Sequence, residues 1–320
     1  MKIVIPDDYQ DAARQTGSFG RLSGHEVVIH HDTLKTLPEL AERFAGAEAL
    51  LLIRERTPIN EELLNLLPDL RLISQTGQGV GHIDLAACSR RGIVVCGAGS
   101  GTLATAEFAW TMIMASRRHL ALEAQMLRAG RWQTSIGTVL KGRTLGIYGY
   151  GKIGKLVAGF ADAFGMKVVT GGGRAATAER AEKDGRPYIA EQSRFFEICD
   201  VISVHLRLLA ATRGVITGAD LARMKADALF VNTSRAELVE PGALVRALKS
   251  GRPGYAAVDV YEDEPVATDH PLLAMDNVLC TPHLGYVEKD TYELFFGVAI
   301  EQIEAFAAGR PINVLNPPSR

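Results

Sequence analysis

Three types of side chain that could take part in catalysis follow predicted strands in the last third of the chain. Arg235 follows the run 228–233, acidic residues follow the run 255–260, and His283 follows the run 277–281. Ligands of open α/β sheets bind beyond the carboxyl ends of the strands, so these side chains are expected to lie together. An arginine binds a carboxylate through a planar fork, a histidine transfers protons near neutral pH, and a carboxylate stabilises a protonated imidazole. The set indicates reduction of a 2-oxo acid, or oxidation of a 2-hydroxy acid.

Spacing does not identify the acid that would partner the histidine. Glu262, Asp263 and Glu264 are consecutive after the run that contains Asp259. Each candidate also has a structural interpretation, because a lone arginine is commonly a surface ion pair and a run of acids is commonly solvated. A lone histidine is likewise more often structural than catalytic. The combination of the three residue types favours catalysis.

A glycine pattern upstream indicates dinucleotide binding. Residues 149–154 read G-Y-G-K-I-G, which fits G-x-G-x-x-G between a predicted strand and a helix. Gly149 permits a tight turn, Gly151 lets the backbone approach a pyrophosphate, and Gly154 allows close packing of helix on strand. The free N–H groups at the helix start, where Lys152 and Ile153 lie, would then face the phosphates. One side of this helix is expected to be apolar: Ile153, Val157, Phe160 and Phe164.

The choice between NAD and NADP is open. The acid that binds the ribose of NAD is expected about 20 residues onward from the motif. Here the second strand ends in three glycines and Arg174, and the first acid afterwards is Glu179. Arg174 would pair with the 2′-phosphate of NADP, or it is a solvated arginine on a flexible glycine loop.

Short β-branched runs alternate with helical stretches along the chain, which predicts two doubly wound α/β units with parallel sheets. We find no sequence repeat between the two. The first series of predicted strands is Lys2–Ile5, Glu26–His30, Ala49–Ile53, Leu70–Ser74 and Ile93–Cys96. The second series is Thr144–Gly149, Lys167–Thr170, Asp200–Leu206, Ala228–Thr233, Tyr255–Val260 and Asn277–Thr281.

Two helical stretches frame the second series. The stretch from Thr102 to Arg128 is predicted as one long helix, and the stretch 288–308 as another, followed by an extended tail at 311–318. Because the last helix lies beyond the final strand of the second unit, it could return to pack on the first unit. Candidates for burial on the first helix are Phe108, Met112, Leu120 and Leu127; those on the last are Tyr292, Phe296, Ala299, Ile303 and Phe306.

The composition is that of a globular protein of two domains, with 47% hydrophobic and 22% charged residues over 320 positions. A net charge of −2 without a basic stripe argues against nucleic-acid binding. No segment is apolar enough to span a bilayer, and Pro6 and Asp7 interrupt the first apolar run, unlike a signal peptide. The four cysteines are scattered, which predicts reduced thiols in a cytoplasmic protein without a metal site.

With these motifs, the sequence resembles the D-isomer-specific 2-hydroxyacid dehydrogenase family over essentially its whole length. The matching stretches are residues 149–154, V-N-T-S-R at 231–235, A-V-D-V-Y-E-D-E-P at 257–265 and T-P-H-L-G at 281–285. The resemblance implies a Rossmann dinucleotide-binding domain at 100–286, inserted into a flavodoxin-like substrate domain formed by 1–99 and 287–320. It also implies a D-configured substrate and a homodimer built on the 102–128 helix.

The resemblance further implies roles for single residues. Arg235 would orient the substrate, Glu264 and His283 would form the acid/base pair, and Asp259 would hold the nicotinamide carboxamide. Other implied cofactor contacts are Thr105, His205, Thr233 and Ser234. The backbone N–H groups that would receive the substrate carboxylate belong to Gly77, Gln78, Gly79 and Val80.

Four positions depart from the family pattern. Gly81 replaces a common acid, Ala236 replaces a glycine, Arg207 replaces a proline, and the stretch 171–174 lacks the acid. Arg207 and the stretch 171–174 put the cofactor preference and the adenosine contacts in doubt. The catalytic residues Arg235, Glu264 and His283 are unaffected.

Two alternatives remain open. One is an inactive relative that senses NAD(H) and recruits partners, although the chain has almost no extra tail for that purpose. The other is a formate dehydrogenase, which would have glutamine in place of Glu264.

Overall fold

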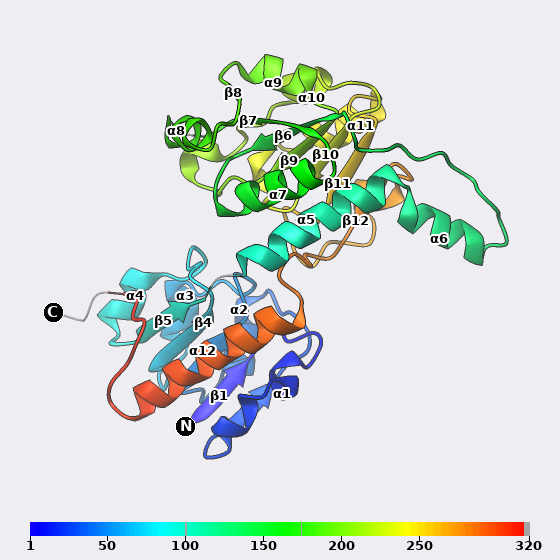
Figure 1. The fold of residues 1–320 in the computed structure, drawn as a ribbon. Helices are drawn as coiled ribbons and strands as arrows, with labels where there is room; N and C mark the ends of the chain where they lie inside the picture. Colours follow the sequence, from blue (N-terminus) through cyan, green and yellow to red (C-terminus); the bar gives the residue numbers. More distant parts are fainter. Residues whose placement is uncertain (100, 174, 317–320) are drawn as a thin grey trace. The chain divides into compact units, whose positions relative to one another are not determined.

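The computed structural model describes residues 1–99, 101–173 and 175–316. The chain forms two compact units, one made of Met1–Gly101 with Val287–Arg320 and the other of Thr102–Tyr286 (Figure 1). The second unit is therefore inserted into the first along the chain. Both are α/β units with entirely parallel sheets, as the alternation of strands and helices predicted.

The first unit has a five-stranded sheet in the order β2-β1-β3-β4-β5, which is the flavodoxin-like order. Strands β3 and β4 have no exposed residue, since a parallel sheet is covered on both faces. The strands are β1 Lys2–Ile5, β2 Glu26–Ile29, β3 Ala49–Leu52, β4 Leu72–Thr76 and β5 Val94–Ala98. The helices are α1 Ala12–Gln15, η1 Phe19–Leu22, α2 Leu37–Arg43, α3 Glu61–Asn65, α4 Leu85–Arg90 and α12 Lys289–Ala307.

Helix α12 packs on this sheet through fully buried side chains that include Phe296 and Ile300. The hydroxyl of Ser74 on β4 donates to the Ala299 carbonyl at 2.9 Å and lies 2.8 Å from Oε1 of Gln302. The predicted extended tail then runs antiparallel to β5, where the side chain of Asn316 bonds to the backbone of Ile93 and Val95.

The second unit has a seven-stranded sheet in the order β12-β11-β10-β9-β6-β7-β8, a Rossmann arrangement with one added strand. The strands are β6 Thr144–Tyr148, β7 Lys167–Gly171, β8 Tyr188–Ile189, β9 Val201–Val204, β10 Leu229–Asn232, β11 Tyr255–Val258 and β12 Val278–Cys280. The helices are α5 Thr102–Arg117, α6 Leu120–Arg128, α7 Lys152–Ala163, α8 Ala175–Lys183, α9 Gln192–Ile198, η2 Ala210–Thr212, α10 Gly218–Ala222, η3 Ala236–Leu238, α11 Ala243–Lys249 and η4 Pro271–Ala274.

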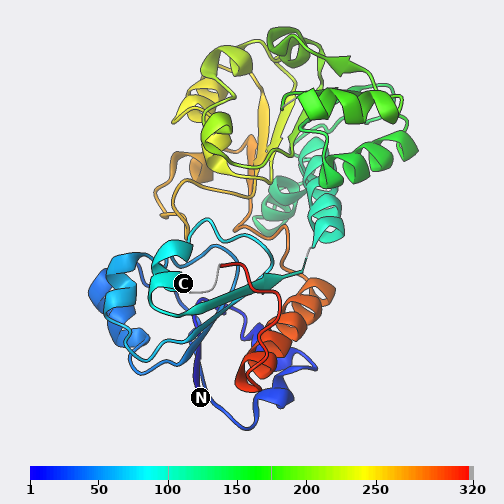
Figure 2. The same ribbon diagram turned by 90° about the vertical axis from the view of Figure 1, so that its left-hand side faces the viewer.

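Helices cover both faces of this second sheet (Figure 2). One face has a core that contains Tyr148, Phe195 and Phe230. The other face has a core that contains Trp110 of α5 and Val157 of α7. The helix that follows the glycine motif is thus anchored by its predicted apolar side, except that Phe164 is its C-cap, 45% exposed, with its ring 5.0 Å from that of Trp110.

The prediction of one helix from Thr102 to Arg128 is wrong. His119 adopts a left-handed conformation with φ of 51°, and it separates α5 from α6. Leu120 and Leu127 are 63% and 58% exposed, and α6 has no buried residue. The end of α5 is instead tied to the sheet by the buried Arg117, whose guanidinium donates to the backbone carbonyls of residues 200 and 227, both at 2.6 Å.

The other differences from prediction are small. Strand β8 was not predicted because two residues are too short to show a pattern. The strands predicted at 70–74 and 93–96 lie one or two residues later, at β4 and β5, and several predicted ends are one or two residues too long.

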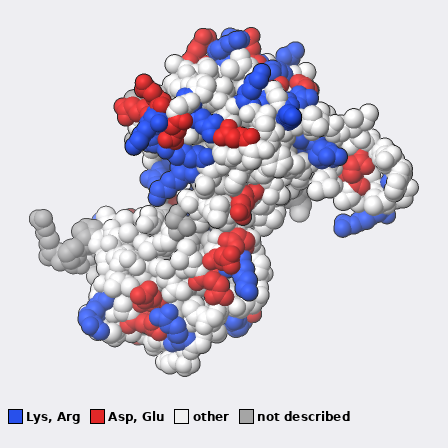
Figure 3. Space-filling model, viewed as in Figure 1, with Lys and Arg blue, Asp and Glu red and all other residues white. Residues whose placement is uncertain are grey.

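On the face shown in Figure 3, basic and acidic side chains are interspersed over both units. Among the described residues, no helix has the length and apolar character that crossing a membrane requires. The four cysteines are free thiols, and burial raises the pKa of Cys199 to about 12 and that of Cys88 to about 11.

Candidate active site

The glycine motif forms the turn between β6 and α7. Gly149 has φ of 99°, and a Cβ there would lie 2.9 Å from the carbonyl oxygen of His205. A Cβ on Gly154 would lie 2.7 Å from the Gly149 carbonyl oxygen, so only glycine allows this close packing of helix on strand. Gly151 caps α7 without a side-chain bond, and nothing lies within 4 Å of where its Cβ would be. The turn therefore leaves the open helix start that a pyrophosphate requires.

The conformation and packing at the end of β7 explain why the acid that would bind the ribose is absent. Gly172 has φ of 66°, and a Cβ there would lie 2.5 Å from the ring of Tyr148. An aspartate at this position would need both a strained backbone and displacement of a buried ring. Arg174, the predicted partner of a 2′-phosphate, lies outside the described residues.

The end of β9 places His205 beside the glycine turn. The backbone N–H of His205 donates to the Tyr148 carbonyl, and the ring Nε2 is 2.9 Å from the hydroxyl of Ser203. Burial lowers the pKa of His205 to about 4, so the ring is neutral at physiological pH. The side chain of Leu206 lies beside Gly149 and Gly173, whereas Arg207 is exposed.

The turn after β10 holds Arg235. The side chain of Asn232 shapes it, since Oδ1 accepts from the Ser234 N–H at 3.0 Å and Nδ2 donates to the Arg235 carbonyl at 2.8 Å. Thr233 is buried, and its hydroxyl has no partner among the described residues. Ala236 is buried within η3, so the departure from glycine is accommodated. Sequence reasoning missed Asn232, although it lies within the V-N-T-S-R motif.

The carboxylate of Asp259, fully buried at the end of β11, accepts three hydrogen bonds from the turn after β12. The Thr281 hydroxyl donates at 2.6 Å, the Leu284 N–H at 2.7 Å and the Gly285 N–H at 2.9 Å. Burial raises the pKa of Asp259 and these donors oppose the rise. Thr105 of α5 lies next to this turn, with Cγ2 3.6 Å from where a Cβ on Gly285 would be.

The structure pairs His283 with Glu264. Nδ1 of His283 is 2.7 Å from Oε2 of Glu264, and the other carboxylate oxygen accepts from the Tyr261 N–H at 3.0 Å. Burial alone would raise the pKa of Glu264, but the hydrogen bond and charge of His283, with the Tyr261 N–H and Arg235, lower it overall. Glu262 lies instead 3.9 Å from the ring of His270.

His283 has φ of 53°, a left-handed conformation that is uncommon outside glycine. Its ring packs edge-on against Tyr286 with centroids 5.5 Å apart. Non-glycine residues in this conformation persist when the surroundings hold them, and they cluster at functional sites.

In the first unit, the loop 77–80 follows β4. Gly77 has φ of 89°, and a Cβ there would collide with the guanidinium of Arg54. A Cβ on Gly79 would collide with the carboxylate of Glu55. Gly81 is exposed with open space around it, so packing does not explain the loss of the family's acid there. Sequence reasoning missed Arg54 and Glu55, although two charged residues soon after the buried strand β3 were a usable signal.

Taken together, the second unit is a dinucleotide-binding domain of an oxidoreductase, with a paired histidine and carboxylate at its strand ends. Residues 110–285 match the family model described as D-isomer specific 2-hydroxyacid dehydrogenase, NAD binding domain. The chain belongs to this family, and it is an NAD(P)-dependent oxidoreductase of 2-hydroxy acids.

Individual relatives agree with this assignment. A glyoxylate reductase from Aeropyrum pernix is 37% identical over 269 residues, covering 81% of this chain and 80% of the relative. A D-3-phosphoglycerate dehydrogenase from Archaeoglobus fulgidus is 33% identical over the whole chain, which spans only 60% of that enzyme. A solved oxidoreductase structure from Ralstonia solanacearum is 50% identical with a TM-score of 0.97, covering 99% of this chain and 97% of its own.

The geometry at Asp259 predicts a cost for removing its charge. In Asp259→Asn, the amide group would replace one acceptor by a donor that faces N–H groups, which is expected to lower the free energy of unfolding by about 2–4 kcal/mol. Urea unfolding measures the loss. Asp269→Asn is the matched control, because Asp269 is exposed on the following loop. A change in Asp259→Asn no larger than about 0.5 kcal/mol, as for an ordinary surface substitution, would contradict the assignment.

Proposed function

We propose that this chain reduces a small 2-oxo acid to the D-2-hydroxy acid, and catalyses the reverse reaction, with Arg235, Glu264 and His283 as its catalytic residues. The contact of 2.7 Å between Glu264 and His283 carries the proposal. It joins a half-buried carboxylate to an imidazole in the same unit as the dinucleotide motif. Residues 100–286 would form the cofactor domain, and 1–99 with 287–320 the substrate domain.

The pair defines which imidazole atom exchanges the proton. A carboxylate on Nδ1 keeps a proton there, so Nε2 is the atom that gives a proton to the substrate oxygen in reduction and takes it back in oxidation. Glu264 stabilises the protonated ring and fixes its orientation. Arg235 supplies the planar fork that orients the substrate carboxylate.

The bound cofactor supplies or accepts the hydride, and this chain's residues hold it. The helix start at Gly151, Lys152 and Ile153 would take the pyrophosphate, with Gly149 and Gly154 shaping the turn. The remaining proposed contacts are Thr105, Thr233, Ser234 and Asp259 toward the nicotinamide side, and Arg174 and His205 toward the adenosine side.

The first-unit loop 77–80 is proposed to offer backbone N–H groups to the substrate carboxylate. Arg54, which packs on Gly77, adds a fixed positive charge to this loop. Relatives named glyoxylate reductase and D-3-phosphoglycerate dehydrogenase support small 2-oxo acids as the substrate class.

The alternatives are less well supported. A formate dehydrogenase has no use for an acid/base pair, and here Glu264 is in contact with His283. A sensor of NAD(H) would not need Arg235, Glu264 and His283 together. We also propose a cytoplasmic location, on the grounds of the four free cysteines.

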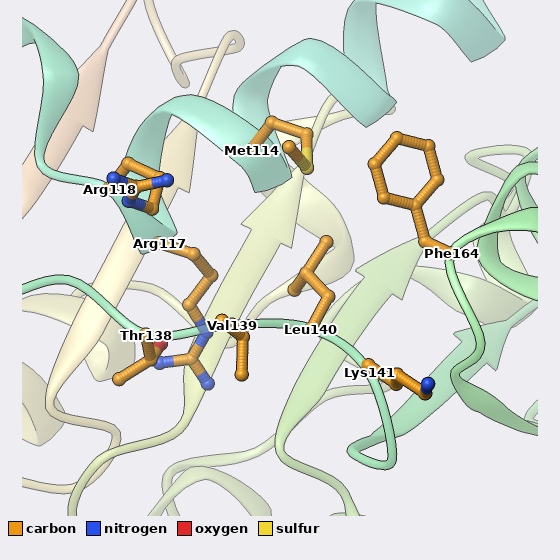
Figure 4. A pocket seen from close by; sticks show the side chains of 8 residues that line it. All are labelled: Met114, Arg117, Arg118, Thr138, Val139, Leu140, Lys141 and Phe164. Atoms are coloured by element: carbon orange, nitrogen blue, oxygen red, sulfur yellow. The ribbon is translucent and has the colours of Figure 1, made fainter.

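We propose that the chain forms a homodimer through α5, α6 and the segment 129–140. Three large apolar side chains of this segment, Trp132, Ile136 and Val139, are at least 73% exposed. The end of the segment lines a hollow of about 230 Å³, whose apolar lining residues include Met114, Leu140 and Phe164 (Figure 4). Exposed apolar patches of this kind mark protein interfaces. Light scattering should give twice the chain mass of 34.6 kDa, and a monomer at micromolar concentration would refute the dimer.

The proposed function predicts turnover on a panel of substrates. Purified protein with NADH or NADPH should reduce at least one of glyoxylate, hydroxypyruvate, pyruvate or a bulkier 2-oxo acid, measured by loss of nicotinamide absorbance. In the same panel Arg235→Lys, which keeps the charge but loses the fork, should lose about 2–4 kcal/mol of transition-state stabilisation without weaker cofactor binding. Cofactor binding without turnover on any substrate would favour the sensor.

The pair predicts a shift in the pH profile of reduction. Because the pKa of Glu264 is lowered, its carboxylate is ionised across the working range and favours the protonated imidazole. Glu264→Gln should therefore move the alkaline limb of the pH–rate profile to lower pH, and His283→Gln should lower turnover by about 10²–10⁴. Glu262→Gln is the control and should leave the limb in place. An unmoved limb in Glu264→Gln would show that the two residues are not coupled.

A further inference from the structure

Arg180 of α8 lies beside the glycine turn, and the proposed function gives it no role. Its Nε donates to the carbonyl oxygen of Tyr150 at 2.9 Å, and Tyr150 is the second residue of the glycine motif. Its Nη2 is 3.4 Å from the hydroxyl of Thr177, a buried residue. The guanidinium is therefore held between the glycine turn after β6 and the start of α8.

The charge of Arg180 is not neutralised within the described part of the chain. No described carboxylate lies within 4.0 Å of its guanidinium, whereas its neighbours Lys155 and Arg186 pair with Asp184 and Asp162. The first turn of α8 contains no acid. A fixed guanidinium without a counter-ion, beside a turn built for phosphates, is suited to a further anionic group.

The groups near Arg180 suit a phosphorylated ribose better than a free one. The ring of Tyr148 occupies the volume where an acid at position 172 would begin, so this position supplies no carboxylate for a 2′-hydroxyl. The Thr177 hydroxyl lies 2.5 Å from where a Cβ on Gly173 would be, which brings a donor to the same strand end. Leu206 packs beside Gly149 and Gly173 and gives the neighbouring surface an apolar side chain.

We infer that Arg180 and Thr177 bind the 2′-phosphate of NADP(H), and that this chain prefers NADP(H) to NAD(H). The inference rests on the proposed function, since it concerns the cofactor of that same site. The competing explanation is that Arg180 only braces the Tyr150 carbonyl. These two explanations differ in whether the 2′-phosphate itself contributes to binding.

Equilibrium binding of 2′,5′-ADP and 5′-AMP, measured by calorimetry, tests the inference without turnover. The parent should bind 2′,5′-ADP at least about tenfold more tightly, the size of one charge-assisted contact. Arg180→Ala should remove about tenfold of the affinity for 2′,5′-ADP and change that for 5′-AMP by less than about twofold. Thr177→Val should act in the same direction. The matched control is Arg194→Ala, because Arg194 is an exposed arginine of the same unit that pairs with Glu197.

Equal affinity of the parent for the two nucleotides would overturn the preference for NADP(H). Equal losses of affinity for both nucleotides in Arg180→Ala would show that Arg180 only supports the Tyr150 carbonyl. Selective binding that survives Arg180→Ala would overturn the assignment to Arg180. If Arg180→Ala does not fold, Arg180→Lys replaces it and should retain part of the selectivity. In each case turnover on the substrate panel would leave the proposed function standing, whereas failure to bind either nucleotide would count against that function itself.

Discussion

One buried carboxylate fixes the backbone at the reacting end of the second unit. Asp259 has no exposed surface, and its three donors all belong to the turn at 281–285. The same turn carries His283 in a left-handed conformation, which costs on the order of 1–3 kcal/mol unless the surroundings hold it. Hydrogen bonds to a charged acceptor contribute about 1.5–3 kcal/mol each, which is enough to offset that cost. The position of the imidazole thus depends on a residue that does not touch it.

Core packing also constrains the cofactor side of the second unit. The ring of Tyr148 packs against Phe195 and Phe196, with centroids 5.6 and 5.7 Å away, and its hydroxyl donates to Gln192. This buried ring is what excludes a side chain at position 172. The absence of the ribose-binding acid is therefore not an isolated substitution in a flexible loop. It follows from the aromatic core behind β6 and β7.

The sequence predicted the architecture well because strands buried on both faces appear as continuous apolar runs. It failed where the outcome depends on what a helix packs against. The apolar periodicity of residues 102–128 continues through His119. It does not show that Leu120 and Leu127 are exposed. Residues such as Asn232 and Arg180 were missed for a related reason. Arg180 contacts Tyr150 on a distant turn, and Asn232 acts through the conformation of its own turn; apolar periodicity carries no information about either kind of contact.

Local sequence also could not identify which of the acids at 262–264 would partner the histidine. The surroundings of these acids in the structure identify it. Two carboxylates bond to the segment 281–285, and their pKa values are shifted in opposite directions. For Asp259, burial outweighs its hydrogen-bond donors and the charge of His283, and raises its pKa. Glu264 is half-buried and faces the imidazole and Arg235, so partners outweigh burial and lower its pKa. The opposed shifts reflect two different environments, one dominated by a charged partner and one dominated by burial. Glu264 is therefore the residue suited to stabilise a charged His283, while Asp259 holds the turn.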